Sequence, residues 1–148
     1  MTTLNPGTYQ FQAIDTEYWS PIQYGSNDPL YVIAGKWVAD DWCNFFVKKH
    51  AENSVTIQDK LGHYLSLIQY STGGPYYLVA SQKNHVDNWC IFYVSDGTVP
   101  NTINFQVHGN DNVYYLTVIN ADSRNYIEAT NDSDPAWRNF SVTLINSD

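Results

Sequence analysis

The sequence predicts an all-β protein built from three repeats of four short strands. The motif Trp-x-x-Phe-x-Val occurs three times, and its tryptophans Trp42, Trp89 and Trp137 are 47 and 48 residues apart. Short runs of β-branched and aromatic residues alternate with turns rich in Gly, Asn, Asp and Pro. No stretch shows the apolar period of a long amphipathic helix. Together these observations favour strands throughout the chain.

The first strand of each repeat alternates apolar and polar residues, as a half-buried strand does. Its apolar side should face the core, with Gln12, Gln58 and Gln106 facing outward. The residues expected to point inward are Tyr9, Phe11 and Ala13, then Val55, Ile57 and Asp59, and then Ile103, Phe105 and Val107. The first strand is also expected to pair with the last, residues 140–145, so that the sheet closes.

The second and third strands follow the first at nearly constant spacing. The third strand carries the motif Tyr-x-x-Ala, which begins at Tyr31, Tyr77 and Tyr126 and lies 19, 19 and 20 residues after the outward glutamine. Turn residues separate it from the second strand. The second strands are expected at residues 18–22, 64–68 and 115–119.

The fourth strand contains the tryptophan motif. Cys43, Phe45 and Val47 are expected on its inner face, and Cys90 occupies the place of Cys43 in the second repeat. The tryptophan of each repeat should then lie on the opposite face, under a hairpin or beside a cleft. Repeat symmetry separates the two cysteines, which are expected to be buried and not to form a disulfide.

Three such units fit a β-trefoil with pseudo-threefold symmetry. One unit alone can neither bury its apolar face nor pair its edge strands. Three units supply six strands that close a barrel and three hairpins that cap one end of it. We expect a single domain, residues 1–148, with repeats at about 7–52, 53–100 and 101–148.

The charge balance excludes several kinds of partner. The chain carries 7 Lys and Arg against 15 Asp and Glu, a formal net charge of −8. Phosphate groups are repelled by such a chain, so neither nucleic acid nor an anionic membrane surface is expected to bind. No apolar stretch is long enough for a membrane span, and no secretory signal is visible. These features predict a cytoplasmic protein, the alternatives being a mature form or a protein that leaves the cell by an unusual route.

The sequence contains no signature of catalysis. The four histidines have no metal-ligand spacing, and there is no nucleophile turn or phosphate loop. The acidic residues cluster in expected loops, where solvation explains them. We therefore expect neither an enzyme nor a bound metal or cofactor.

The loops before the tryptophans combine Asp and Asn with aromatic residues. Carboxylates and amides can hydrogen-bond sugar hydroxyls while an aromatic ring covers the apolar face of the sugar. The structural alternative is that these residues only form turns. The candidate carbohydrate-binding residues are Asn84, His85, Asp87, Asn88 and Tyr76 in the second repeat, and Trp37, Asp40 and Asp41 in the first.

The third repeat is expected to provide the poorest pocket. It offers Asn131, Asp132 and Asp134, but Pro135 and Ala136 stand directly before Trp137, where the other repeats have polar residues.

The repeated pattern of Tyr-x-x-Ala followed by Trp-x-x-Phe, over residues 7–145, resembles the fungal ricin-B-like β-trefoil lectins. Within that family the chain is similar to the lectin-like light subunits of mushroom tyrosinases and their mannose-binding relatives.

The resemblance implies a sugar-binding protein, or a companion subunit that docks on a catalytic partner such as tyrosinase and performs no chemistry. The chain departs from the family because it has no Gln-x-Trp near the fourth strands. By that departure the sugar site is expected to be weakened, moved or lost. The alternative function is a protein-interaction trefoil, either such a subunit or a protease inhibitor using residues 48–50 or 73–75 as its inserted loop.

Overall fold

The computed structural model of the chain describes residues 4–80, 86–131 and 135–147. These ranges contain twelve strands and three single-turn 3-10 helices, all joined by turns. The strands are β1 (Gly7–Gln12), β2 (Tyr18–Ile22), β3 (Leu30–Lys36), β4 (Phe45–Ala51), β5 (Ser54–Gln58), β6 (Leu65–Gln69), β7 (Tyr76–Ala80), β8 (Phe92–Asp96), β9 (Thr102–Gly109), β10 (Asn112–Ala121), β11 (Arg124–Thr130) and β12 (Phe140–Ser147). The prediction of an all-β chain is confirmed.

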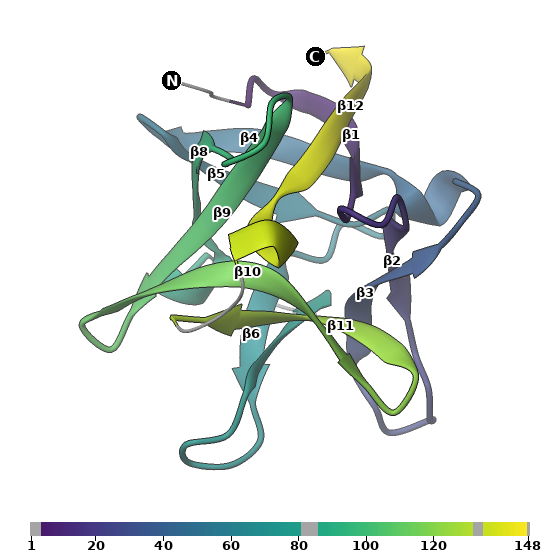
Figure 1. The fold of residues 1–148 in the computed structure, drawn as a ribbon, viewed down its shortest axis with the longest axis vertical. Helices are drawn as coiled ribbons and strands as arrows, with labels where there is room; N and C mark the ends of the chain where they lie inside the picture. The colour runs from purple at the N-terminus through teal and green to yellow at the C-terminus, as the bar shows by residue number, and fades with distance from the viewer. Residues whose placement is uncertain (1–3, 81–85, 132–134, 148) are drawn as a thin grey trace.

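Six of the strands form a closed ring. β1 pairs with β4 and β12, β4 with β5, β5 with β8, β8 with β9, and β9 with β12. β1 and β12 run antiparallel from Gly7 opposite Ser147 to Gln12 opposite Ser141. They lie side by side at the end of the molecule that carries both chain termini (Figure 1). The predicted pairing of the first strand with the last is therefore confirmed.

The remaining strands form three hairpins, β2–β3, β6–β7 and β10–β11. The third strands of the units pair with one another in a triangle, β3 with β7, β7 with β11, and β11 with β3. At its centre the rings of Tyr31, Tyr77 and Tyr126 contact each other, with centroids 5.3 to 5.8 Å apart. Equivalent residues of three units thus meet around one axis.

The predicted inward faces of the first strands form the core. None of their nine inward residues is more than 7% exposed, and the outward Gln12, Gln58 and Gln106 are half-buried. Trp19 lies at the centre of an aromatic cluster, with its ring centroid 4.8 Å from that of Phe11 and 4.9 Å from that of Phe140. Burial of such large aromatic rings is the main stabilising contribution to the fold.

The predicted position of the tryptophans on the fourth strands is wrong. Each lies in a 3-10 helix just before its strand, in η1 (Asp41–Cys43), η2 (Asn88–Cys90) or η3 (Pro135–Arg138). A backbone bond such as Cys43 N–H to the Asp40 carbonyl, 3.0 Å, closes the turn. The strands β4, β8 and β12 begin only at the motif phenylalanines. Cys43 and Cys90 are buried, and neither forms a disulfide.

Candidate functional site

In the first repeat, the candidate Asp40 is part of the scaffold. Its Oδ1 accepts a hydrogen bond from the backbone N–H of Trp42 at 3.0 Å and so caps η1. Its Oδ2 lies 2.6 Å from the Lys36 ammonium. That hydrogen bond holds the pKa of Asp40 below its usual value. Both carboxylate oxygens are already engaged within the protein.

The two other candidates of the first repeat lie on the open surface. Trp37 is 66% exposed, and the Asp41 carboxylate is 3.9 Å from the Lys60 ammonium. Lys60 also lies over the ring of Trp42, 5.1 Å from its centroid. These contacts form an exposed charged and aromatic patch.

In the second repeat, Asp87 has the same role as Asp40. Its Oδ1 accepts a hydrogen bond from the Trp89 backbone N–H at 3.0 Å and caps η2. For both aspartates the turn-forming interpretation accounts for the hydrogen bond to the backbone. Asn84 and His85 lie outside the described residues.

Tyr76 and Asn88, the remaining candidates, lie in neighbouring depressions that share Asn110. Tyr76 stacks on Trp89, with centroids 5.0 Å apart and ring planes 22° apart, and contacts Tyr114 at 5.2 Å. The Asn110 amide donates a hydrogen bond to the Tyr76 hydroxyl at 3.1 Å. An aromatic cluster thus adjoins side-chain amides.

This cluster borders a cleft of about 600 Å³ between the β6–β7 turn of the second unit and β11 of the third. We refer to it as the inter-unit cleft. It is lined by Gln69, Thr72, Gly73, Gly74, Pro75, Tyr76, Asn110, Tyr114, Glu128, Ala129, Thr130 and Asn131. It combines two aromatic side chains with amide, hydroxyl and carboxyl groups, which is the composition that sugar recognition requires. Its volume is within the range of small-molecule sites.

The turn that forms one wall of the cleft is held by internal bonds. The Gln69 amide donates to the Gly74 carbonyl at 2.8 Å, and the Gly74 N–H donates to the Ser71 carbonyl at 2.9 Å. Gly73 has a φ of +78°, a conformation that glycine adopts without strain. Residues 73–75, suggested above as an inhibitor loop, form this wall, and residues 48–50 lie in β4 instead of a protruding loop.

A cleft at the matching place one unit earlier provides an internal comparison. It lies between the β2–β3 turn and β7, and its volume is about 450 Å³. There the positions of Tyr76 and Glu128 are taken by Leu30 and Val79. The inter-unit cleft is therefore distinguished by the polar and aromatic residues that break the threefold repeat.

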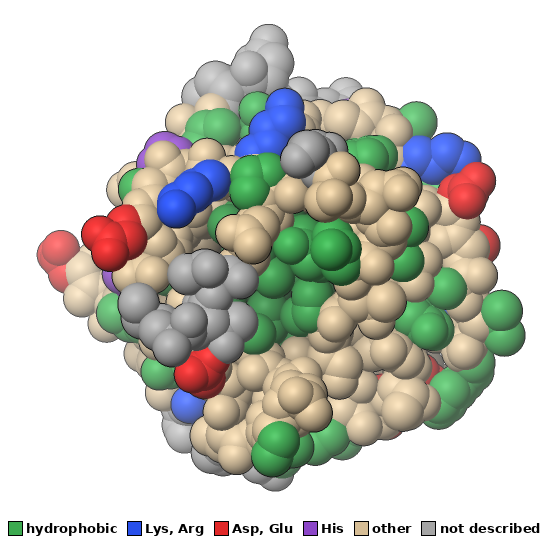
Figure 2. All heavy atoms as spheres, turned by 90° about the horizontal axis from the view of Figure 1, so that it is seen from above, with side chains coloured by type: hydrophobic (Ala, Val, Ile, Leu, Met, Phe, Trp, Pro, Cys, Tyr) green, Lys and Arg blue, Asp and Glu red, His purple; other side chains and the backbone are tan. Residues whose placement is uncertain are grey.

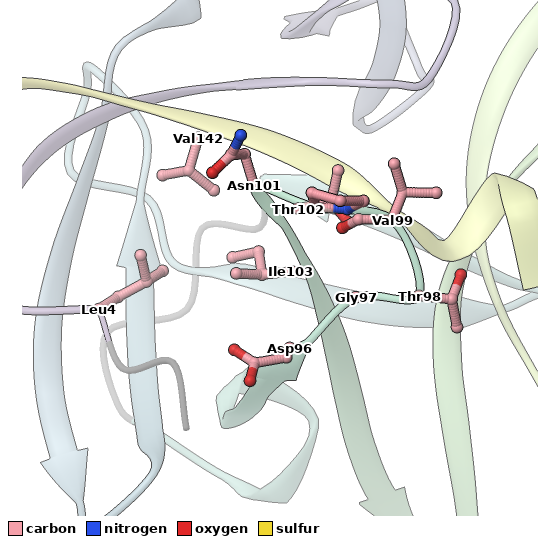
Figure 3. A pocket seen from close by; sticks show the side chains of 10 residues that line it. Leu4, Asp96, Gly97, Thr98, Val99, Asn101, Thr102, Ile103 and Val142 are labelled. Carbon is pink, nitrogen blue, oxygen red and sulfur yellow. The ribbon is translucent and has the colours of Figure 1, made fainter.

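A further pocket, of about 610 Å³, lies beside the β8–β9 connection. Figure 3 shows Leu4, Ile103 and Val142 around its opening, with Asp96 at its edge. Figure 2 looks onto the end with the termini, where hydrophobic side chains gather around a hollow. Among the described residues that line this pocket, none has a buried polar atom without a hydrogen-bond partner. Its described lining has polar side chains but no aromatic ring to cover the apolar face of a sugar.

Sequence reasoning identified Tyr76 and mentioned Asn131, but it missed Asn110, Tyr114 and Glu128. Comparing the repeats would have identified Glu128, because the equivalent residues Ile33 and Val79 are aliphatic. Within the described ranges, no group of three or more His, Cys, Asp or Glu side chains is arranged to hold a metal ion. In the same ranges no helix is long and apolar enough to cross a membrane.

Comparison with known proteins relates the fold to lectins. No family model and no curated protein matches the sequence. A Polyporus squamosus lectin bound to the epitope Neu5Aca2-6Galb1-4GlcNAc superimposes with a TM-score of 0.74 at 11% identity, over 97% of this chain and 50% of that one. A Macrolepiota procera ricin B-like lectin in complex with lactose gives 0.69 at 10% identity, covering 98% and 100%.

The designed threefold-symmetric protein ThreeFoil gives a TM-score of 0.72 at 12% identity, with 94% of this chain and 99% of that one covered. The chain spans half the length of the Polyporus lectin chain. These structures are β-trefoil proteins, and the chain shares their fold. At such low identity the likeness concerns the fold alone.

Proposed function

We propose that the protein is a non-enzymatic β-trefoil lectin or lectin-like protein that binds glycans in the inter-unit cleft. The observation that carries this proposal is the convergence of Tyr76, Tyr114, Asn110 and Glu128 on one cleft of about 600 Å³. Aromatic rings cover the C–H face of a sugar, and amides and carboxylates hydrogen-bond its hydroxyl groups. The fold relatives crystallised with lactose or a sialylated epitope support the same class of ligand.

The proposal moves the site away from the loops that sequence reasoning favoured. Asp40 and Asp87 cap 3-10 helices, so one oxygen of each carboxylate is committed to the backbone. The ranking of the third repeat as poorest rested on its loop, of which residues 132–134 lie outside the described chain. The cleft uses β11 of that repeat instead, together with the β6–β7 turn. A moved site is consistent with the missing Gln-x-Trp motif.

A glycan array of neutral mannose- and galactose-containing oligosaccharides tests the function, followed by calorimetry on the best ligand. The double variant Asn110→Gly and Asn131→Ala removes two amides from the cleft, and glycine tolerates the φ of +50° at position 110. We expect about tenfold weaker binding, which corresponds to about 1.4 kcal/mol. The matched control Trp37→Ala with Asp41→Ala, on the exposed patch of the first repeat, should bind as the native chain does.

Two results contradict the proposal. Failure to bind any glycan on the array removes the lectin function. Equal affinity of the native chain and the cleft variant, with weaker binding by the control, places the site in the first repeat.

The alternative of a companion subunit has one observation in its favour. Five tyrosines form a contiguous ring cluster around the axis of the hairpins, and the Arg124 guanidinium lies 3.5 Å from the centroid of the Tyr24 ring. Tyr and Arg are enriched in protein interfaces. The cluster consists of Tyr24, Tyr31, Tyr70, Tyr77 and Tyr126. A stoichiometric enzyme partner that free sugar does not elute, and that Tyr70→Ser fails to retain, favours this function.

A further inference from the structure

Glu128 breaks the threefold pattern at a buried position. The third strands read Tyr-x-Ile-Ala, Tyr-x-Val-Ala and Tyr-x-Glu-Ala, so Ile33 and Val79 are its counterparts. Each of these three residues lies opposite a tyrosine of the central triangle, and Glu128 is opposite Tyr77. The fold accepts an aliphatic side chain here in two units. Packing therefore does not explain a carboxyl group in the third.

The Glu128 side chain is largely buried at the edge of the inter-unit cleft. The residue is 7% exposed, and no hydrogen bond or ion pair joins its carboxyl group to any residue that the structure describes. Burial raises the pKa of Glu128 from its usual value of 4.5. Removing a carboxylate from water costs free energy, which a hydrogen-bond donor or a positive charge offsets. A cationic ligand in the cleft would provide both to Glu128.

Two buried hydroxyl groups lie beside Glu128. Thr117 lies directly opposite Glu128 on β10, and Thr130 follows two residues later on the same face of β11. Thr117 Oγ1 and Thr130 Oγ1 are buried and have no hydrogen-bond partner in the part of the chain that the structure describes. Glu128 and Thr130 both line the inter-unit cleft. One edge of the cleft thus presents the Glu128 carboxyl group and the adjacent Thr130 hydroxyl oxygen, and both can accept hydrogen bonds.

The acceptor groups at this edge favour a ligand that donates hydrogen bonds. A carboxylate only accepts hydrogen bonds, so the ligand must donate them, and an ammonium group offers three donors with a compensating charge. A divalent metal would need more oxygen ligands than one carboxylate and two hydroxyls supply, and no three-residue metal cluster occurs in the described ranges. The net charge of −8 also attracts cations and disfavours anionic sugars.

We propose that the inter-unit cleft binds a sugar residue that carries a protonated amino group, with Glu128 as its counter-ion and Thr130 as a second acceptor. This proposal rests on the proposed function and names the sugar class. The ring of the sugar lies against the aromatic side chains Tyr76 and Tyr114, and its amine points to β11. A lysine side chain of a protein carries the same ammonium group, but it has no ring for these aromatic residues to cover.

Isothermal titration calorimetry with three tetrasaccharides of one β1,4-linked backbone tests this. The tetramers of glucosamine, N-acetylglucosamine and glucose differ only at carbon 2, where they carry an amine, an amide or a hydroxyl. At a pH at which the amine is protonated, we expect the native chain to bind the glucosamine tetramer about tenfold more tightly than either analogue. Glu128→Gln should abolish this preference, so that the three tetramers bind the variant with affinities within about twofold of one another.

The variant Glu128→Val, which installs the residue of the second unit, should behave as Glu128→Gln does, and thermal melts of both variants confirm that they are folded. Equal binding of the three tetramers by the native chain overturns the inference but leaves the proposed function standing. Binding of none of them overturns the inference, and the proposed function is overturned only if the glycan array is negative as well. A preference for the amine that survives in Glu128→Gln overturns the inference, as does equally tight binding of Nα-acetyl-lysine amide.

Discussion

Three acidic residues of this chain have different roles, which depend on their surroundings. Asp40 and Asp87 accept backbone N–H groups at the start of 3-10 helices, which fixes the entry to the fourth strands. Glu128 is buried among strands and accepts no hydrogen bond from the described residues. The first two stabilise the fold, whereas we propose that the third interacts with a ligand.

The capping aspartates make a prediction about stability. Asp87→Ala removes the oxygen that accepts the Trp89 N–H, so the free energy of unfolding should fall by about 1 kcal/mol. Asp40→Ala should have a similar effect, with an added loss of the Lys36 contact. Urea denaturation followed by tryptophan fluorescence measures both. The control Asp41→Ala, whose side chain is 82% exposed, should change stability by less than about 0.5 kcal/mol; an equal effect of all three contradicts the capping role.

For Glu128 we expect the opposite effect of substitution on stability. Glu128→Val should raise the free energy of unfolding by about 1–3 kcal/mol, because it removes a largely buried carboxyl group that has no hydrogen-bond partner among the described residues. Since the folded state raises the pKa of Glu128, it holds the proton more tightly than the unfolded chain does. The resulting stability is full below the unfolded pKa and is lost as pH rises through the folded pKa.

The gain from Glu128→Val should therefore be larger at about pH 7 than at about pH 4, as measured by urea denaturation at both. A gain that is the same at both pH values means that Glu128 is ionised equally in the folded and unfolded chains. Loss of stability in the variant means that Glu128 has a structural partner.

At the scale of elements, strand alternation and repeat spacing were enough to predict most of the fold. The inward positions of β1, β5 and β9 follow from parity, because neighbouring side chains in a strand point to opposite faces. The 3-10 helices could not be predicted in this way, since they depend on a side-chain cap that competes with strand extension over a few residues. They shift the tryptophans off the fourth strands.

The pairing of β1 with β12 makes a prediction about closure. Deleting residues 141–148 removes most of β12 and with it every β12 residue that pairs with β1 from Gly7 to Gln12, so that β1 pairs only with β4 and β2. The barrel then has two open edges, so cooperative unfolding should be lost. Differential scanning calorimetry tests this. Deletion of residues 147–148 alone removes only the pair with Gly7 and should preserve a cooperative transition; a cooperative melt of the longer deletion contradicts the closed ring.

The candidate site was less predictable than the fold, for a reason that concerns elements as well. Its wall comes from the β6–β7 turn of one unit and β11 of the next, and these segments are adjacent only because the third strands pair in a triangle. The loops that the sequence emphasised lie within single repeats. Composition identified the right residue types, but only the packing of units shows which of them share a cleft.

The net charge of the whole molecule should influence which ligands bind and how strongly salt affects their binding. With 15 acidic against 7 basic side chains, the field around the protein favours cationic ligands and weakens as salt screens it. Raising ionic strength from about 0.05 M to about 0.5 M should weaken binding of the glucosamine tetramer about threefold. Calorimetry with the glucose tetramer is the control, because a neutral ligand should be insensitive to salt. The same salt response for both ligands contradicts an electrostatic contribution.

The central claim is that glycans bind between the second and third units. Titration of the ¹⁵N-labelled protein with the best glycan, followed by NMR chemical shifts, tests it most directly. We predict that the amides that move most belong to residues 69–76, 110–114 and 128–131, on three segments that line the inter-unit cleft. Shifts centred instead on Lys36 to Trp42 of the first repeat, or on the tyrosine cluster, would contradict the account.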